Sequence, residues 1–137
     1  MNEITADIKA LLEQAGFDAD SSSSGAVTWA VYENYEPDSP NQVITIFDGG
    51  DRPLYTQANS LSGLMEEHDF QIRVRGYNPE ECKAIISQIR TAIENLGRTT
   101  INSLVYHNII KTSGPFDLGY NESSLSVWTV SFQATRG

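Results

Sequence analysis

The chain has 137 residues and a formal net charge of −9 at pH 7, with 39% hydrophobic and 20% charged residues. This size and composition are typical of one globular domain, so we expect a single domain over residues 1–137. Its basic residues are scattered singly, which argues against a nucleic-acid-binding surface, and its one cysteine excludes an internal disulfide framework. Neither a signal-peptide pattern nor an apolar run of membrane-spanning length is present, so we expect the protein in the cytoplasm of the producing cell.

The first third of the chain is predicted to hold one helix and two strands. Apolar residues recur at helical spacing in residues 2–15, which predicts a helix. Four consecutive serines make residues 18–25 a predicted loop. β-Branched and aromatic residues predict strands at 27–32 and 42–47, joined by the proline-containing turn segment 34–41.

The next segment is predicted to be the least regular part of the chain. Asp48-Gly49-Gly50-Asp51 supplies residues that tolerate positive φ and therefore predicts a turn. Residues 51–64 are rich in serine, asparagine and glycine, which favours a long loop with at most a short strand at Leu54 and Tyr55. A loop of this length inside a compact domain is often functional.

A strand followed by a helix is the clearest pattern in the sequence. Apolar and polar residues alternate in residues 67–77, which is typical of a strand with one buried face. Asn78 then has the position of an N-cap, and Pro79 that of the first helical residue. Apolar residues at helical spacing continue from there, so we predict a helix over residues 79–96.

The last third of the chain is predicted to be strand. Two strands are expected at 101–111 and 125–134, separated by a break at 113–115 and a turn at 121–124. The predicted order is α-β-β-β-α-β-β. Because amphipathic helices cannot bury their apolar stripes alone, we expect an α+β two-layer sandwich, with both helices packed on a mainly antiparallel or mixed sheet.

No residue pattern for catalysis, cofactor binding or metal binding is found. The two histidines, His68 and His107, lack the spacing of zinc ligands; His68 is expected to be exposed in an acidic segment and His107 to be structural. No nucleophile elbow or phosphate-binding loop is present, and residues 48–51 lack the ligands of a calcium loop. A site assembled in three dimensions from residues far apart in sequence leaves no local pattern, so an enzyme stays an alternative.

Arg73 and Arg75 share the polar face of the strand at 67–77. They are interpreted either as solvated residues or as subunit-interface residues that pair with carboxylates of another subunit. An RNA-binding sheet would have aromatic residues beside them, and Asp69 and Gln71 stand there instead.

The whole layout resembles the tail-terminator and related minor capsid (head–tail joining) proteins of long-tailed bacteriophages. The resemblance is carried by the order and combination of four pieces. These are the opening helix Ile4–Ala15 ending in Gly16-Phe17, the strand 69–76 that runs into the helix 79–96, the stretch 113–119, and the closing strand 127–132.

This resemblance implies a structural virion protein that is not an enzyme and needs no cofactor. Members form hexameric rings that cap the tail tube at its final length and join it to the head. The expected partners are therefore other copies of the chain, the tail tube protein and a head-completion or neck protein, with no membrane. DNA would pass through the lumen without sequence-specific binding. The expected location is the head–tail junction of the virion, after assembly in the host cytoplasm.

In this family, loops that project from the sheet contact the tube and the neck. The matching segments here are 18–25 and 48–64, although an ordinary loop packed on its own core is an equal alternative for the second. The candidates for partner contact are Asp51, Arg52, Leu54, Tyr55, Leu61 and Met65.

Other functions remain open from the sequence. A head-closure or tail-completion protein of the neck would share the virion context, and a small intracellular binding module would be of a different class. An oligomer without a deep pocket favours a terminator, one well-formed cavity favours a binding module, and converging titratable groups with perturbed pKa values favour an enzyme.

Overall fold

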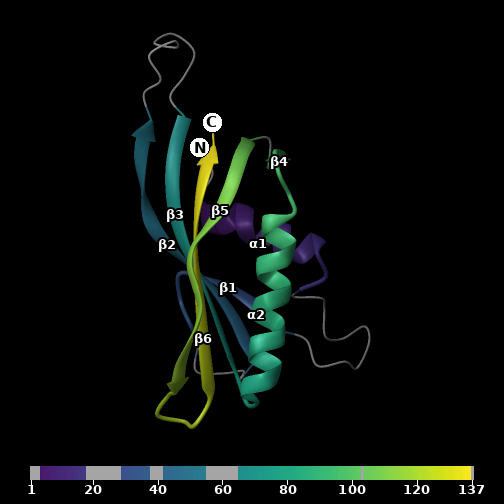
Figure 1. Ribbon diagram of the computed structural model, residues 1–137, viewed down its shortest axis with the longest axis vertical. Helices are drawn as coiled ribbons and strands as arrows, with labels where there is room; N and C mark the ends of the chain where they lie inside the picture. Colours follow the sequence, from purple (N-terminus) through teal and green to yellow (C-terminus); the bar gives the residue numbers. More distant parts are fainter. Residues whose placement is uncertain (1–3, 18–28, 38–41, 55–64, 103, 137) are drawn as a thin grey trace.

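The computed structural model describes residues 4–17, 29–37, 42–54, 65–102 and 104–136. Six strands form one mixed sheet in the order β1-β2-β3-β6-β5-β4, in which β1 pairs parallel with β2 and every other pair is antiparallel. Figure 1 shows this strongly curled sheet with the two helices beside it. In chain order the elements are α1 (Ile4–Gln14), β1 (Ala30–Glu33), β2 (Val43–Leu54), β3 (Met65–Gly76), α2 (Pro79–Glu94), β4 (Thr99–Ile101), β5 (Leu104–Tyr120) and β6 (Ser126–Arg136).

The α+β class and the mixed sheet with two helices are confirmed. The observed order, α-β-β-β-α-β-β-β, contains one strand more than predicted, because the three-residue β4 is too short to produce an alternating pattern. The sheet is also not a flat layer: it curls as a half-barrel. Register shifts in β2 and β5 are consistent with this curl, since bulges bend a strand and increase its twist.

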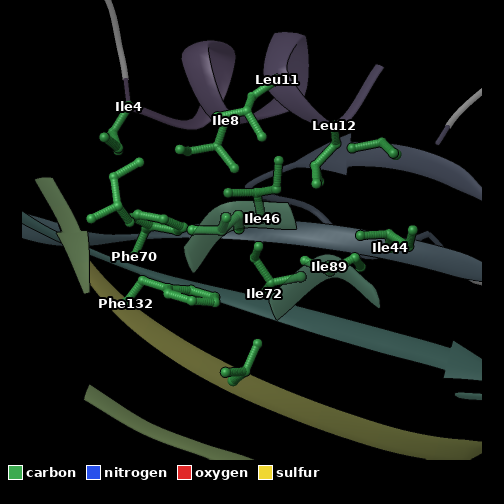
Figure 2. Close-up of a cluster of buried hydrophobic side chains, with 14 of the residues drawn as sticks. Ile4, Ile8, Leu11, Leu12, Ile44, Ile46, Phe70, Ile72, Ile89 and Phe132 are labelled. Atoms are coloured by element: carbon green, nitrogen blue, oxygen red, sulfur yellow. The ribbon is translucent and has the colours of Figure 1, made fainter. Parts of the chain in front are cut away.

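The core lies on one face of the sheet. Strand alternation places Ile72 of β3 opposite Ile46 of β2 and Val130 of β6, so all three point to the same side. The buried apolar residues of α1 and α2 join this cluster, so both helices cover the same face. Figure 2 shows side chains of α1 pointing at Ile44, Ile46, Phe70 and other sheet residues, with Ile89 of α2 in the same cluster.

Local sequence signals explain both helices. Asn78 caps α2 by accepting a hydrogen bond from the Glu80 amide at 2.8 Å, and Pro79 follows as the first helical residue. Such a cap stabilises a helix by about 1 kcal/mol. At the end of α1, Gly16 has a φ of +101°, and the Phe17 amide donates to the Leu12 carbonyl at 2.9 Å. This is a Schellman motif, as predicted from Gly16-Phe17.

The predicted turn at 48–51 is wrong, because β2 continues through it to Leu54. The strand passes this point with a bulge between Asp48 and Asp51. Gly50 has a φ of +100°, and a Cβ at Gly49 would lie 2.9 Å from the Asp69 carbonyl oxygen. The two glycines therefore allow a bulge in a continuing strand instead of ending it.

The predicted break at 113–115 is wrong for a similar reason. β5 runs through it as a 17-residue strand with four register shifts against β6. Gly114 has a φ of +89°, and a Cβ there would lie 2.8 Å from the Thr129 carbonyl oxygen. Only glycine fits this close approach, and it keeps the long hairpin of β5 and β6 continuous.

Candidate functional site

The densest group of polar side chains is buried between α1 and the sheet. The Asp7 carboxylate of α1 is fully buried and accepts hydrogen bonds from the Tyr106 hydroxyl of β5 and from Asn102 Nδ2, the latter at 2.8 Å. Arg136 of β6 lies 3.3 Å from the carboxylate and donates to the Tyr106 oxygen at 3.0 Å. Burial raises the pKa of Tyr106, so its hydroxyl keeps the proton that it donates to Asp7.

This Asp7 network continues to the surface through His68. Arg136 Nη2 lies 3.4 Å from His68 Nδ1, and His68 Nε2 lies 2.8 Å from Asp48 Oδ1. Because an arginine can only donate, Nδ1 must accept, and Nε2 carries the proton that is donated to Asp48. Burial alone would raise the pKa of Asp48, but the Gly50 amide and His68 outweigh it and hold that pKa below its usual value.

The prediction that His68 is exposed is wrong, because its side chain is buried against Arg136. The sequence contains the information that places it there. His68 is two residues before Phe70 and four before Ile72, so in a strand it points to the same face as these two core residues. The acidic neighbours of His68 favour exposure, but its position in the alternation places the side chain on the buried face.

Two hollows in the described part of the chain adjoin α2. One, of about 360 Å³, is lined by residues that include Trp29 and Ile85. The other, of about 390 Å³, is a shallow hollow lined by Ser87, Gln88, Thr91 and Ala92. The Asp7 network joins α1 to β2, β3, β5 and β6.

Within the described ranges, no three His, Cys, Asp or Glu side chains lie close enough together to hold a metal ion. No helix described in the structure is long and apolar enough to cross a membrane. The only cysteine, Cys82, is buried in α2, and this burial raises the pKa of its thiol to about 11.

Arg73 and Arg75 lie on the face of the sheet opposite the core. Both point at Glu36 of the same chain, whose Oε2 is 3.6 Å from Arg73 Nη1 and 3.9 Å from Arg75 Nη1. Arg75 is buried and donates to the Pro37 carbonyl at 2.5 Å, whereas Arg73 lies partly exposed over the ring of Phe47. The two arginines thus hold the segment after β1 against the sheet, and their predicted role at a subunit interface stays a prediction.

The residues predicted for partner contact are brought together by the hairpin of β2 and β3. Asp51, Arg52 and Leu54 lie in the distal part of β2 and Met65 begins β3, with Leu54 paired to Met65. These four residues occupy strand positions at one end of the molecule (Figure 1), which corrects the predicted loop. The other two, Tyr55 and Leu61, and the predicted loop at 18–25 lie outside the described residues.

A group of exposed apolar side chains that the sequence did not predict lies on the second half of β5. The neighbouring strand β4 pairs only with Leu104–Tyr106, and no described strand pairs with that edge of residues 108–120. Four of the six large apolar side chains that are exposed in the described residues lie on this stretch. These residues, named here the apolar edge, are Ile110, Phe116, Leu118 and Tyr120, which are 49%, 55%, 50% and 67% exposed. Their register against β6 places Ile110 and Phe116 on the face of the sheet opposite the core and Tyr120 on the core-side face, so both faces of this stretch carry exposed apolar side chains.

Exposed apolar side chains along an unpaired strand edge are typical of a protein that binds other proteins. Comparison with known proteins identifies the family to which the chain belongs. The model of the bacteriophage tail terminator protein family matches residues 11–136, and the chain belongs to this family. Members are structural virion proteins and not enzymes, as the resemblance to the family implies.

Solved structures show the same fold at low sequence identity. A chain from the virion of a native gene transfer agent particle has a TM-score of 0.65 and 15% identity, covering 98% of this chain and 95% of that chain. A second solved chain has a TM-score of 0.56 and 12% identity, covering 98% of this chain and 97% of that chain. No curated protein sequence matches significantly.

Proposed function

We propose that the protein is a tail terminator that forms a hexameric ring, closes the tail tube at its final length and joins it to the head. Membership of the tail terminator family supports the structural role, and the likeness to a chain of a virion particle supports the fold. The observation in the structure that carries the proposal is the apolar edge of β5, which lies exposed in a chain of net charge −9. An isolated acidic monomer gains nothing from such a surface, whereas a ring buries it.

The partners follow from this role. One end of the ring meets the tail tube protein and the other meets a head-completion or neck protein, at the head–tail junction of a virion assembled in the host cytoplasm. The end of the β2–β3 hairpin, with Asp51, Arg52, Leu54 and Met65, is our candidate for tube or neck contact, together with Tyr55 and Leu61. DNA passes through the lumen without sequence-specific contacts, since the acidic chain repels phosphates.

The first test is the absolute mass of the protein in solution by light scattering, over a range of concentrations, followed by electron microscopy of any assembly. The proposal predicts a six-copy species, either free or on the ends of purified tail tubes. Tube ends that bind the protein and stop elongating would support the terminator role. A protein that stays monomeric with and without tubes, and leaves tube elongation unchanged, contradicts it.

A further inference from the structure

Three buried polar atoms are left unsatisfied in one region of the sheet face opposite the core. In the part of the chain that the structure describes, Glu36 Oε1, Thr45 Oγ1 and Arg73 Nε have no hydrogen-bond partner. Thr45 of β2 is directly paired with Arg73 of β3, so their side chains stand next to each other, and Glu36 lies 3.6 Å from Arg73 Nη1. Because a buried polar group without a partner is unfavourable, this arrangement suits none of the three side chains.

The contact between Glu36 and Arg73 is also loose. Glu36 Oε2 lies 3.6 Å from Arg73 and 3.9 Å from Arg75, so both distances are longer than a hydrogen bond and one oxygen is shared by two cations. Arg75 is the more firmly held of the two, because it is buried and donates to the Pro37 carbonyl. Arg73 keeps 34% of its side chain exposed. A second carboxylate can therefore reach Arg73 and form a closer, bidentate pair with it.

A second copy of the chain is the partner whose charge fits this site. The chain has 18 acidic and 9 basic residues, so every copy has an excess of carboxylates. Glu13, Glu80 and Glu122 are exposed examples. Arg73 lies on the sheet face that neither helix covers, which leaves its exposed tip open to a neighbour. Pairing of this cation with a carboxylate also relieves the repulsion between two acidic copies.

We propose that Glu36 is a placeholder, whose position at Arg73 is taken in the assembly by a carboxylate of a second copy. This inference rests on the proposed function, in which copies of the chain meet in a ring. The Glu36 side chain turns to solvent, while the Arg75 contact with Pro37 keeps the backbone of this segment in place. Arg73 Nε and the Thr45 hydroxyl then donate to the incoming carboxylate, so the assembly satisfies atoms that the single chain leaves unsatisfied.

Removal of the placeholder charge tests this competition. Glu36→Gln weakens the internal contact, and Glu33→Gln on β1 is the matched control because it changes the net charge by the same amount. Glu36→Gln should strengthen self-association about 3-fold or more relative to Glu33→Gln, since association no longer competes with Glu36. Sedimentation measures this in solution; if the chain assembles only on purified tail tubes, labelled copies are counted on the tube ends. Equal association of the two variants overturns the inference.

Removal of the cation gives the second arm of the test. Arg73→Gln should weaken self-association about 10-fold, and Glu36→Gln added to it should have no further effect, because no contact is left to compete for. An effect of Glu36→Gln that persists without Arg73 contradicts the placeholder role. If Arg73→Gln lowers the melting temperature, Arg73→Lys replaces it, because lysine keeps the charge but loses the bidentate geometry.

Thr45→Val tests whether the buried atoms are unsatisfied in the single chain. Valine has nearly the same shape, so loss of a hydroxyl without a partner should leave the monomer at least as stable, while association becomes weaker. A clear loss of monomer stability would show that an ordered water already satisfies the hydroxyl, and this result overturns the inference.

The failure of this inference can be told apart from failure of the proposed function. If the unsubstituted chain forms six-copy rings and closes tubes while the Glu36 and Arg73 variants behave like Glu33→Gln, the inference fails and the terminator role stands. If these variants change only the binding to tubes and not the contact between copies, the carboxylate belongs to the tube protein, which also overturns the inference. If the unsubstituted chain neither self-associates nor binds tubes, both proposals fail.

Discussion

The two halves of β5 differ in what surrounds them. The first half, Leu104–Ile109, pairs with β4 and β6 and places Tyr106 in the buried Asp7 network. The second half pairs on one edge only and carries the exposed Phe116, Leu118 and Tyr120. One continuous strand therefore contributes to the buried network at one end and carries exposed apolar side chains at the other. Substitutions in the first half should change stability, and those in the second half should change association.

The largest expected effect comes from Asp7→Ala. This change leaves Arg136 and the Tyr106 hydroxyl without their buried acceptor, and loss of one partner of a buried ion pair typically costs about 3–5 kcal/mol. Urea denaturation followed by circular dichroism measures the free energy of unfolding. Glu13→Ala, on the exposed side of the same helix, is the control. A loss below about 1 kcal/mol would show that the network does not stabilise the fold.

Tyr106→Phe should have a smaller effect on the same network. The ring stays in place, but Asp7 loses one donor and Arg136 loses one acceptor, which costs about 1–3 kcal/mol. The midpoint of urea denaturation should fall while the oligomer distribution stays as it was. A change in association without a change in stability would contradict the division between the two halves of β5.

Gly114→Ala changes the boundary between the two halves. The new Cβ would lie 2.8 Å from the Thr129 carbonyl oxygen at a φ of +89°, which we expect to cost about 1–3 kcal/mol. Gly119→Ala is the matched control, because its φ is +84° but nothing lies within 4 Å of the added Cβ. Thermal unfolding of both variants separates steric contact from backbone strain. Equal losses would mean that the close approach to β6 has no effect.

The contribution of Asp48 should depend on pH. Its pKa is lowered in the folded protein, so its stabilisation is fully present above the ordinary value of 3.8 and disappears as the pH falls through the lowered value. Asp48→Asn should therefore be less stable than the unsubstituted chain at neutral pH, with the difference shrinking in strong acid. We expect a small difference, because the side chain is 41% exposed. Unfolding curves from pH 7 to pH 2 measure it, and a difference that is independent of pH would contradict the lowered pKa.

The smallest effect on stability is expected for Phe116→Ser. This side chain is exposed, so the free energy of unfolding should change by no more than about 0.5 kcal/mol. Chemical denaturation of the monomeric fraction checks this value. A loss of several kcal/mol would mean that the side chain belongs to the core of its own subunit and not to an interface.

The sequence predicts those structural features that depend on residues close together in the chain. The C-terminal end of α1, the N-cap of α2 and the alternation in β3 each depend on residues that are close together in the sequence. All three predictions are confirmed. Gly49-Gly50 and Gly114-Pro115 look like turns because their φ preferences suit turns equally well. Only the neighbouring strands, β3 and β6, decide that β2 and β5 continue through them.

The Asp7 network and the apolar edge could not be predicted in the same way. Asp7 and Arg136 are 129 residues apart, and no local pattern links them. The apolar edge depends on which strand ends up unpaired, and this is set by the order of strands in the sheet rather than by the composition of β5. The proposed roles of Arg73 and Arg75 and of the β2–β3 hairpin stay predictions until partners are mixed with the protein.

The pairing of Asp7 with Arg136 should also affect folding during synthesis, because the two residues lie near opposite ends of the described chain. While the ribosome is still translating the region before Arg136, a helix at residues 4–14 has no cation for its acidic side chain, because that cation is 129 residues away. A nascent or prematurely terminated chain that docked this helix would bury an unpaired carboxylate, which is strongly unfavourable. Chains that stop before Arg136 should therefore reach the native fold less readily than the 137-residue chain.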